Sequence, residues 1–493
     1  MFLHKIRVIN LLICPSPDPK PGEGLFFFAM SSHFNFKILK ILYALPAIAL
    51  LQCSSADTKN NGTTPTTPTE RLTDEQLIDL VEKQTFRYFW DFAEPNSGLA
   101  RERYHPDGVY PDNDASTVTT GGSGFGLLSI IAADSRGYIT RTQFMERMTK
   151  IAGFLERADR FHGAWPHWME GTTGHVKPFG TKDNGGDLVE TAFLCEGIIC
   201  VREYLKNGSA DERALAARFD ALWKGVEWDW YRNGQDVLYW HWSPNYNWEM
   251  NFPLEGYNEC LITYVMASAS ETHGITSAPY HKGWARNGGI VSPNTKYGYP
   301  LLLKHNYAEE FGGPLFWAHY SYLGLDPHQL TDQYANYWDV NYNQVMIDYQ
   351  YCVNNPRQYA GYGPDYWGLT ASYTRNPDGS VGYTAHQPSN DTGVISPTAA
   401  VSSIVYTPQQ SIAVMRNLYE NHKLRSWGPA GFYDAHSQQY NWSVPWYLAI
   451  DQGPMVVMIE NYRSGLLWNL FMNAPEVQQG LVKLGFHSGK YNF

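Results

Sequence analysis

Residues 187–206 read DLVETAFLCEGIICVREYLK, a stretch in which apolar side chains recur at the three- and four-residue spacing of an α-helix. Similar segments follow one another from Leu72 almost to the C-terminus, and clusters of Gly, Pro and Asn separate them. The pattern predicts about a dozen helices and few strands, which is more than a simple bundle holds. Paired helices that close into a ring accommodate them, so we expect one all-α domain over residues 72–493.

Four connecting segments are long and rich in Trp, Tyr, Gly and Asn, namely residues 160–186, 228–254, 355–397 and 425–450. Long structured loops in a compact domain are uncommon and often functional. At one end of a ring of helices such loops would form a cleft. Because flat sugar rings pack on aromatic faces, we expect sugar platforms, with the candidates Trp165, Trp168, Trp240, Trp242, Trp442 and Trp446. Some of these side chains must instead belong to the core.

Composition narrows the class of partner. The chain of 493 residues has a formal net charge of -11 and no run of basic residues. A nucleic-acid partner requires clustered Lys and Arg, so this partner class is excluded. Aromatic residues make up 15% of the chain against 17% charged residues, a balance that fits either a sugar-binding cleft or an aromatic-rich core.

Residues 1–53 have the features of an upstream extension, with Met30 as the expected start, followed by a lipoprotein signal peptide. A basic start at Lys37 precedes an apolar stretch over residues 41–51, and Cys53 follows. The apolar stretch is short for a membrane-spanning helix, so we expect membrane contact only through lipid on Cys53. Residues 54–71 are rich in Thr and Pro and predict a tether. The expected location is therefore the periplasm or outer membrane of a Gram-negative bacterium.

Hydrolysis of a glycosidic bond needs one carboxyl group to protonate the leaving oxygen and another to activate water or attack the sugar. Asp183 and Asp187 flank a Gly pair before an expected helix. Asp187 fits either the cap of that helix or a catalytic role, whereas Asp183 is harder to explain as a cap. Glu255 and Glu259 lie four residues apart at the start of another expected helix. Burial and mutual repulsion would raise the pKa of such a glutamate, as a general acid requires, but a solvated first turn explains the pair equally well.

A third cluster runs from residue 449 to residue 463. Asp451 precedes an apolar helix and is either its cap or a catalytic base. Glu460 and Arg463 lie three residues apart and either contact substrate or form a structural ion pair inside the ring. The chain has no His pattern such as HExxH, so we predict neither a metal nor another cofactor.

Several motifs occur in order along the chain: TFRYFWD at 85–91, GFGL at 124–127, GYNE at 256–259, and IDQGP at 450–454 followed by ENYR at 460–463. They resemble the bacterial glycoamylase-domain group, and specifically the β-1,2-glucanases of glycoside hydrolase family 144. The similarity covers nearly the whole of the expected domain, about residues 72–490.

This resemblance implies an (α/α)6 barrel that hydrolyses β-1,2-glucan with inversion, either as an endo-enzyme or as an exo-enzyme releasing sophorose. In that family two Asp residues four apart in a loop and a Glu after Tyr-Asn are needed for activity. The matching positions are Asp183, Asp187 and Glu259. Glu259 is therefore the expected general acid, and Asp451 the expected base by position, with Asp183 and Asp187 as rivals. The substrate-binding set comprises the six tryptophans above with Glu255, Tyr257, Glu460 and Arg463.

Two other functions stay open. A surface glycan-binding lipoprotein without turnover would share the aromatic cleft, but three acids at family positions argue against it. A glucoamylase-like hydrolase of another glucan would keep the barrel and change the bond, because helical barrels serve many sugar chemistries.

Overall fold

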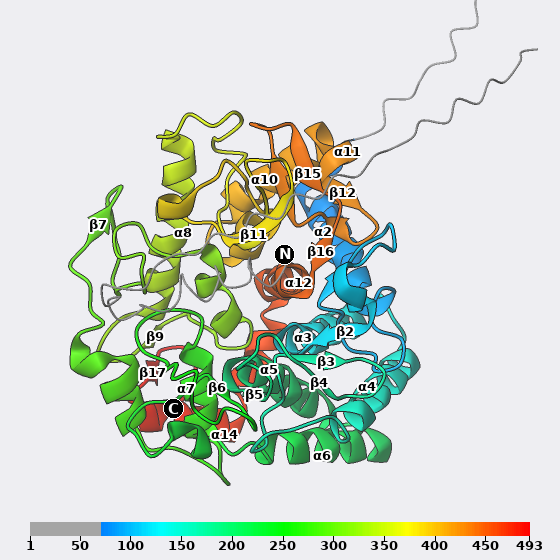
Figure 1. Cartoon of the computed structure of the whole chain (residues 1–493), viewed down its shortest axis with the longest axis vertical. Helices are drawn as coiled ribbons and strands as arrows, with labels where there is room; N and C mark the ends of the chain where they lie inside the picture. The colour runs from blue at the N-terminus through cyan, green and yellow to red at the C-terminus, as the bar shows by residue number, and fades with distance from the viewer. Residues whose placement is uncertain (1–70) are drawn as a thin grey trace, which may run out of the picture. The chain divides into compact units, whose positions relative to one another are not determined.

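A computed structural model of the chain describes residues 71–493 (Figure 1). The expected signal segment, the anchor at Cys53 and all but the last residue of the tether lie outside the described residues. Among residues 71–493, no helix has both the length and the apolar character needed to cross a bilayer.

The α-helices of the described part are α2 (Asp74–Trp90), α3 (Thr120–Arg136), α4 (Arg141–Leu155), α5 (Leu188–Leu205), α6 (Ala210–Lys224), α7 (Leu261–Ala269), α8 (Tyr337–Asn354), α9 (Pro397–Val401), α10 (Pro408–Asn421), α11 (Lys423–Ser426), α12 (Ala449–Ser464), α13 (Leu466–Met472) and α14 (Pro475–Leu484). Short 3-10 helices are η1 (Pro111–Ser116), η2 (Trp230–Arg232), η4 (Arg286–Gly288), η5 (Leu315–Ala318), η6 (Tyr320–Tyr322), η7 (Pro388–Asn390) and η8 (Ser402–Val405), and η3 (Pro279–Trp284) is a π-helix.

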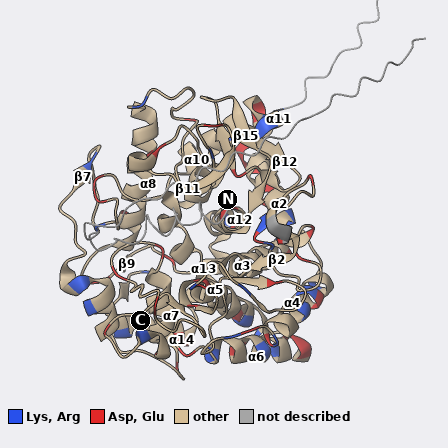
Figure 2. Cartoon of the chain, viewed as in Figure 1, with Lys and Arg blue, Asp and Glu red and all other residues tan. Residues whose placement is uncertain are grey.

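Helices alternate between an inner and an outer layer, which is the (α/α)6 arrangement expected from the sequence (Figure 1). The inner helices α3, α5, α7 and α12 are buried on nearly every side. The outer helices α2, α4, α6 and α10 each bury one face and expose the other. The outer helices α4 and α6 carry charged side chains of both signs (Figure 2). Packing of buried apolar side chains against the outer helices therefore holds the inner helices in place.

Glycine lets two inner helices approach closely. A Cβ atom on Gly124 of α3 would lie 2.2 Å from the Phe193 carbonyl oxygen of α5, and a Cβ on Gly197 would lie 2.5 Å from the Gly124 carbonyl oxygen. The apolar pattern predicts a helix that begins at Gly124, whereas α3 begins four residues earlier, at Thr120. Glycine is unfavourable in an isolated helix. At Gly124 and Gly197, however, the close contact between α3 and α5 leaves no room for a side chain.

Strands are short and lie in the loops. They are β1 (Arg103–Tyr104), β2 (Thr117–Thr119), β3 (Trp168–Glu170), β4 (Val176–Lys177), β5 (Gly186–Asp187), β6 (His241–Trp242), β7 (Thr295–Lys296), β8 (Tyr299–Pro300), β9 (Leu330–Thr331), β10 (Ala371–Arg375), β11 (Val381–Ala385), β12 (Trp427–Gly428), β13 (Gly431–Phe432), β14 (Ala435–Ser437), β15 (Trp442–Val444), β16 (Tyr447–Leu448) and β17 (His487–Ser488). The longest pair is the antiparallel hairpin β10–β11, in which Tyr373 lies opposite Tyr383.

One expected helix differs in a way that matters for the site. The sequence pattern predicts a helix from Glu255 to Glu271, whereas α7 runs only from Leu261 to Ala269. Gly256 has a φ of 76°, in the left-handed region, so the chain turns there instead of continuing a helix. Glu255 and Glu259 are therefore not neighbours on one helix face, and the repulsion expected between them does not apply.

Candidate active site

A cavity of about 570 Å³ lies where the inner helices begin. Thr119 precedes α3, Glu190 is in the first turn of α5, Glu259 lies two residues before α7, and Ile450 is in the first turn of α12; all four line the cavity. Helix N-termini present free N–H groups and partial positive charge. Their convergence explains why this end of the ring can hold several carboxyl groups.

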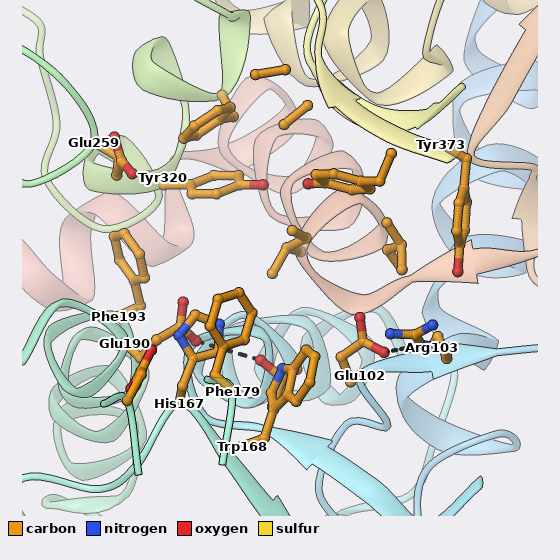
Figure 3. Close-up of a pocket in the computed structure, with 18 of the residues that line it drawn as sticks. Glu102, Arg103, His167, Trp168, Phe179, Glu190, Phe193, Glu259, Tyr320 and Tyr373 are labelled. Carbon is orange, nitrogen blue, oxygen red and sulfur yellow. Dashed lines mark hydrogen bonds and ion pairs between the residues drawn. The ribbon is translucent and has the colours of Figure 1, made fainter. Parts of the chain in front are cut away.

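Glu259 lies inside this cavity (Figure 3). Its side chain is buried, and its Oε2 atom has no hydrogen-bond partner among the described residues. The Ser321 hydroxyl donates to the Glu259 backbone carbonyl and so fixes the main chain. Burial raises the pKa of Glu259 to about 7, and the nearby negative charges of Glu190 and Asp187 act in the same direction. At neutral pH the group can hold a proton and release it, as a general acid must.

Asp187 is both a helix cap and a charge partner. Its Oδ1 accepts hydrogen bonds from the backbone N–H groups of Val189 and Glu190, and its Oδ2 lies 2.9 Å from Nδ1 of His167. Trp240 donates to the same oxygen at 3.2 Å. Burial alone would raise the pKa of Asp187, but the two histidines His241 and His167 and the backbone donors lower it overall. Asp187 is therefore both the cap of α5 and the charge partner of the two histidines.

His167 and His241 balance the charge of the two aspartates. Nδ1 of His241 lies 3.2 Å from Asp183 and 3.6 Å from Asp187. Burial would lower the pKa of His167, but Glu190, Asp187 and Asp183 raise it to about 10, so this imidazole is charged at neutral pH. His167, His241 and Asp183 line the cavity, whereas Asp187 lies behind them. Sequence spacing did not reveal either histidine, because His167 lies 20 residues from Asp187 and His241 belongs to a different loop from Asp183.

Within residues 71–493, one group of side chains has the geometry to hold a cation: ligand atoms of His167, Asp183 and Asp187 lie within 4.8 Å of one another. These groups already pair with each other or with His241, and the imidazoles offset the carboxylate charge. The group has only three potential ligands and is neutralised within the chain, so it fits a metal poorly. The expectation of a metal-free site stays a prediction.

Glu190 is an acid of the cavity that the sequence did not single out (Figure 3). Its Oε2 accepts from the backbone N–H of Gly121 at 2.7 Å and from the Thr119 hydroxyl at 3.4 Å, so it caps helix α3 from the neighbouring helix. Burial raises its pKa, an effect that the charge of His167 partly offsets. Two glutamates, Glu190 and Glu196, interrupt the mainly apolar stretch 188–201, and they were the available signal.

Asp451 lies in the first turn of α12 and is buried, but it is not among the residues that line the cavity. Apart from the neighbouring carboxyl group of Asp434, its side-chain oxygens have no hydrogen-bond partner in the described part. Asp434 also accepts from the backbone N–H of Tyr373 at 2.7 Å. Burial and the charge of Asp434 raise the pKa of Asp451 well above its usual value. Burial beside Asp434 therefore favours the protonated form of Asp451.

Three of the six candidate platforms, Trp168, Trp240 and Trp446, line the cavity. The ring of Trp446 stacks on His105 at 4.1 Å between centroids, and His105 stacks in turn on Tyr110 at 5.0 Å. This row of parallel rings forms an aromatic wall at the part of the cavity that Glu102 and Arg103 also line. Such a wall suits the apolar face of a sugar ring.

The other expected platforms lie elsewhere. Trp165 is fully buried, with Arg160 over its ring, and belongs to the core. Trp242 follows His241 on β6 and points to the opposite side, since neighbouring side chains alternate along a strand; it packs against His162 and Trp230. Trp442 packs against the buried cluster of Tyr373, Val394, Ala435, Val444 and Leu448. None of these three tryptophans lines the cavity.

The polar substrate-binding candidates also lie outside the cavity lining. Tyr257 is fully buried and donates its hydroxyl hydrogen to Asn341 at 2.8 Å. Glu255 is partly exposed and lies 3.6 Å from Arg286. The structure therefore offers these two side chains no contact with a ligand in the cavity.

Glu460 and Arg463 take part in ion pairs toward the end of α12, away from the turn that meets the cavity. Glu460 pairs with Arg136 at 2.6 Å. Arg463 pairs with Glu82, Asp79 and Glu75 of α2. Both residues therefore form structural ion pairs, which was one of the two alternatives. They pair with residues of α3 and α2, however, and not with each other.

An (α/α)6 ring whose aromatic cavity holds a desolvated carboxyl group beside further acids has the parts that a glycoside hydrolase needs. Over residues 251–475 the sequence matches the Glycoamylase family, described as "Putative glucoamylase". The chain is 60% identical to the endo-β-1,2-glucanase from Chitinophaga pinensis, solved in complex with sophorotriose and glucose, with a TM-score of 0.83 over 85% of this chain and 100% of that one. The chain therefore belongs to the glycoamylase-domain family of bacterial β-1,2-glucanases, glycoside hydrolase family 144, as the sequence motifs indicated.

Two further relatives differ in length or identity. An exo-β-1,2-glucooligosaccharide sophorohydrolase acting at the non-reducing end, from Parabacteroides distasonis, is 44% identical over 447 residues. That match covers 86% of this chain, and the chain spans only 60% of the Parabacteroides protein. An endo-β-1,2-glucanase from Talaromyces funiculosus is 14% identical with a TM-score of 0.58 over 83% of this chain and 92% of that one, so it shares the fold.

Proposed function

We propose that this protein hydrolyses β-1,2-glucan and that Glu259 is its general acid. The observation that carries the proposal is the buried, unpartnered Oε2 of Glu259 in an aromatic cavity, with a pKa raised to about 7. Relatives with 44% and 60% identity are named for cleavage of β-1,2-linked glucans, which supports the choice of substrate.

The proposed reaction is an inverting hydrolysis. Glu259 transfers its proton to the glycosidic oxygen, directly or through a substrate hydroxyl, as the bond from that oxygen to the anomeric carbon breaks. A carboxylate takes a proton from water, whose oxygen forms the new bond to the anomeric carbon from the opposite face. Both protons are accounted for, and the product leaves as the α-anomer.

Asp183 replaces Asp451 as the favoured base. A base must be ionised and must reach the water that it activates. Asp183 lines the cavity and pairs with His241, whereas Asp451 lies outside the lining and has a pKa that burial and Asp434 raise well above its usual value. Asp187 then acts as a positioning residue, because it fixes both histidines and the start of α5.

Product analysis tests the proposal. The purified protein is incubated with linear β-1,2-glucan, and NMR follows the anomeric form of the products at early times. Release of α-anomeric oligosaccharides is the expected result, and their size separates endo action from exo release of sophorose. β-Anomeric first products would contradict the inverting mechanism.

The same assay separates the two competing functions. A glycan-binding protein without turnover would bind β-1,2-glucan tightly and release nothing. A hydrolase of another glucan would release reducing sugar from α-1,4-glucan or a different β-glucan instead. The desolvated acid among other carboxyl groups favours turnover, because a binding cleft gains nothing from burying an unpaired carboxyl group.

We further propose that the protein is an exported lipoprotein whose only membrane contact is lipid on Cys53. The sequence pattern of residues 37–53 supports this location. Metabolic labelling with a fatty-acid analogue tests it. Label that is present in the full chain and lost in Cys53→Ala is expected, and label retained in the variant would contradict the anchor.

A further inference from the structure

Tyr320 of η6 is a cavity residue with an unusual hydroxyl group (Figure 3). The side chain is 6% exposed, yet its hydroxyl oxygen has no hydrogen-bond partner in the described part of the chain. Burying a hydroxyl without a partner costs about 1–3 kcal/mol, so such groups are rare unless a ligand uses them. Figure 3 shows this hydroxyl directed into the cavity.

The surrounding residues hold the Tyr320 ring in place. Its centroid lies 5.0 Å from that of Phe125, 5.6 Å from that of Phe193 and 4.8 Å from that of Phe316. These three rings supply the packing that positions Tyr320, and none of them needs its hydroxyl. Several other buried tyrosines use their hydroxyl in the protein; Tyr351, for example, donates to Asp391 at 3.0 Å. Tyr322 also has a hydroxyl without a partner in the described part, but it does not line the cavity.

The hydroxyl of Tyr320 is a neutral donor among acceptors. Burial raises its pKa well above the usual value, and Asp451, Tyr383, Glu190 and Glu259 act in the same direction, so the hydroxyl keeps its proton at neutral pH. The ring and bridging oxygens of a glucan can only accept hydrogen bonds. The ionised carboxylates of the cavity also only accept, so among the acids only the protonated Glu259 can donate to these oxygens. Tyr320 supplies a second neutral donor.

We propose that the Tyr320 hydroxyl donates a hydrogen bond to an oxygen atom of the glucosyl unit beside Glu259, and that this bond serves catalysis and not folding. The inference rests on the proposed function, since it assumes a glucan in the cavity. The proposal adds Tyr320, a neutral hydrogen-bond donor, to the acidic residues that the motifs and the geometry assign to the active site.

The test compares Tyr320→Phe with Tyr351→Phe as a matched control. Removing the Tyr320 hydroxyl is expected to lower kcat/KM about 10- to 100-fold while Tm stays the same or rises, because no protein hydrogen bond is lost. The control removes a hydroxyl that is bonded to Asp391 and lies outside the cavity lining. It is expected to lower Tm and to leave kcat/KM unchanged.

Two results would overturn the proposal: full kcat/KM in Tyr320→Phe, or a fall in Tm as large as that of the control, which would mean a structural partner. Calorimetric binding of sophorotriose is measured in parallel. Binding without turnover by the unmodified protein would refute the proposed hydrolysis. In that case equal affinity of Tyr320→Phe would refute the tyrosine contact, and weaker affinity would retain it.

Discussion

Replacing Glu259 with Gln should make the protein less active and more stable. Gln keeps the size of the side chain but can neither donate the catalytic proton nor ionise. A general acid contributes about 100- to 10,000-fold to the rate, so kcat on β-1,2-glucan should fall by that factor. In the unmodified protein, kcat should fall as the pH rises above about 7, because the acid is then deprotonated.

The gain in stability follows from the raised pKa. The folded protein holds the Glu259 proton up to pH about 7, whereas the unfolded chain loses it near 4.5. Stability is therefore undiminished below pH 4.5, falls between these two values, and is lower by roughly 3 kcal/mol above pH 7. Glu259→Gln removes this penalty, so its Tm should exceed that of the unmodified protein by a few degrees at pH 8 and match it at pH 4.

Kinetic assays and thermal unfolding at both pH values check these outcomes. Glu255→Gln is the control: it lies in the same segment but is partly exposed near Arg286, so kcat and the pH dependence of Tm should hardly change. A Glu259→Gln variant with nearly full kcat would refute the general acid. A pH-independent difference in Tm would refute the desolvated carboxyl group.

Three further outcomes follow from the site and the ion pairs. Asp183→Asn should lower kcat at least 100-fold and by more than Asp451→Asn does, and the reverse order in kinetic assays would return the base to Asp451. Trp446→Ala removes part of the aromatic wall, so KM should rise about 10-fold with a smaller change in kcat; an unchanged KM would count against the platform. Arg463→Ala removes the ion-pair partner of the buried Glu82, which keeps a hydrogen bond from the Tyr138 hydroxyl, so thermal unfolding should show a loss of up to about 3 kcal/mol at unchanged kcat, and lost activity without lost stability would argue for a substrate contact.

The sequence predicted the helices best where a local signal is decisive. Apolar periodicity and Pro408 predict a helix over residues 408–421, and α10 has these bounds; Thr73, a residue type that favours caps, caps α2 with a reciprocal side-chain bond. Thr407 before Pro408 likewise predicts a cap for α10, but its hydroxyl donates to the Ser403 carbonyl in the preceding turn instead. Helix periodicity is local, but the choice among competing hydrogen-bond partners depends on the fold.

For the candidate active site, the local sequence pattern identified acidic residues but not the role of each one. The motif around Glu259 and the spacing of Asp183 and Asp187 pointed to residues that the structure brings together at one end of the ring. The same reasoning placed Glu460 and Arg463 in the substrate-binding set, although both are ion-paired to other helices. An acidic or basic side chain looks the same in the sequence whether it faces a cavity or a buried partner.

The sequence by itself determined the all-α class and the family and predicted the general acid, because these depend on periodicity and on motifs that are continuous along the chain. Only the tertiary structure decided which tryptophans face the cavity, that Asp451 lies beside Asp434, and that Glu190 and Tyr320 line the cavity. These features depend on desolvation and on contacts between segments that are separated in the sequence, such as Glu190 with Gly121.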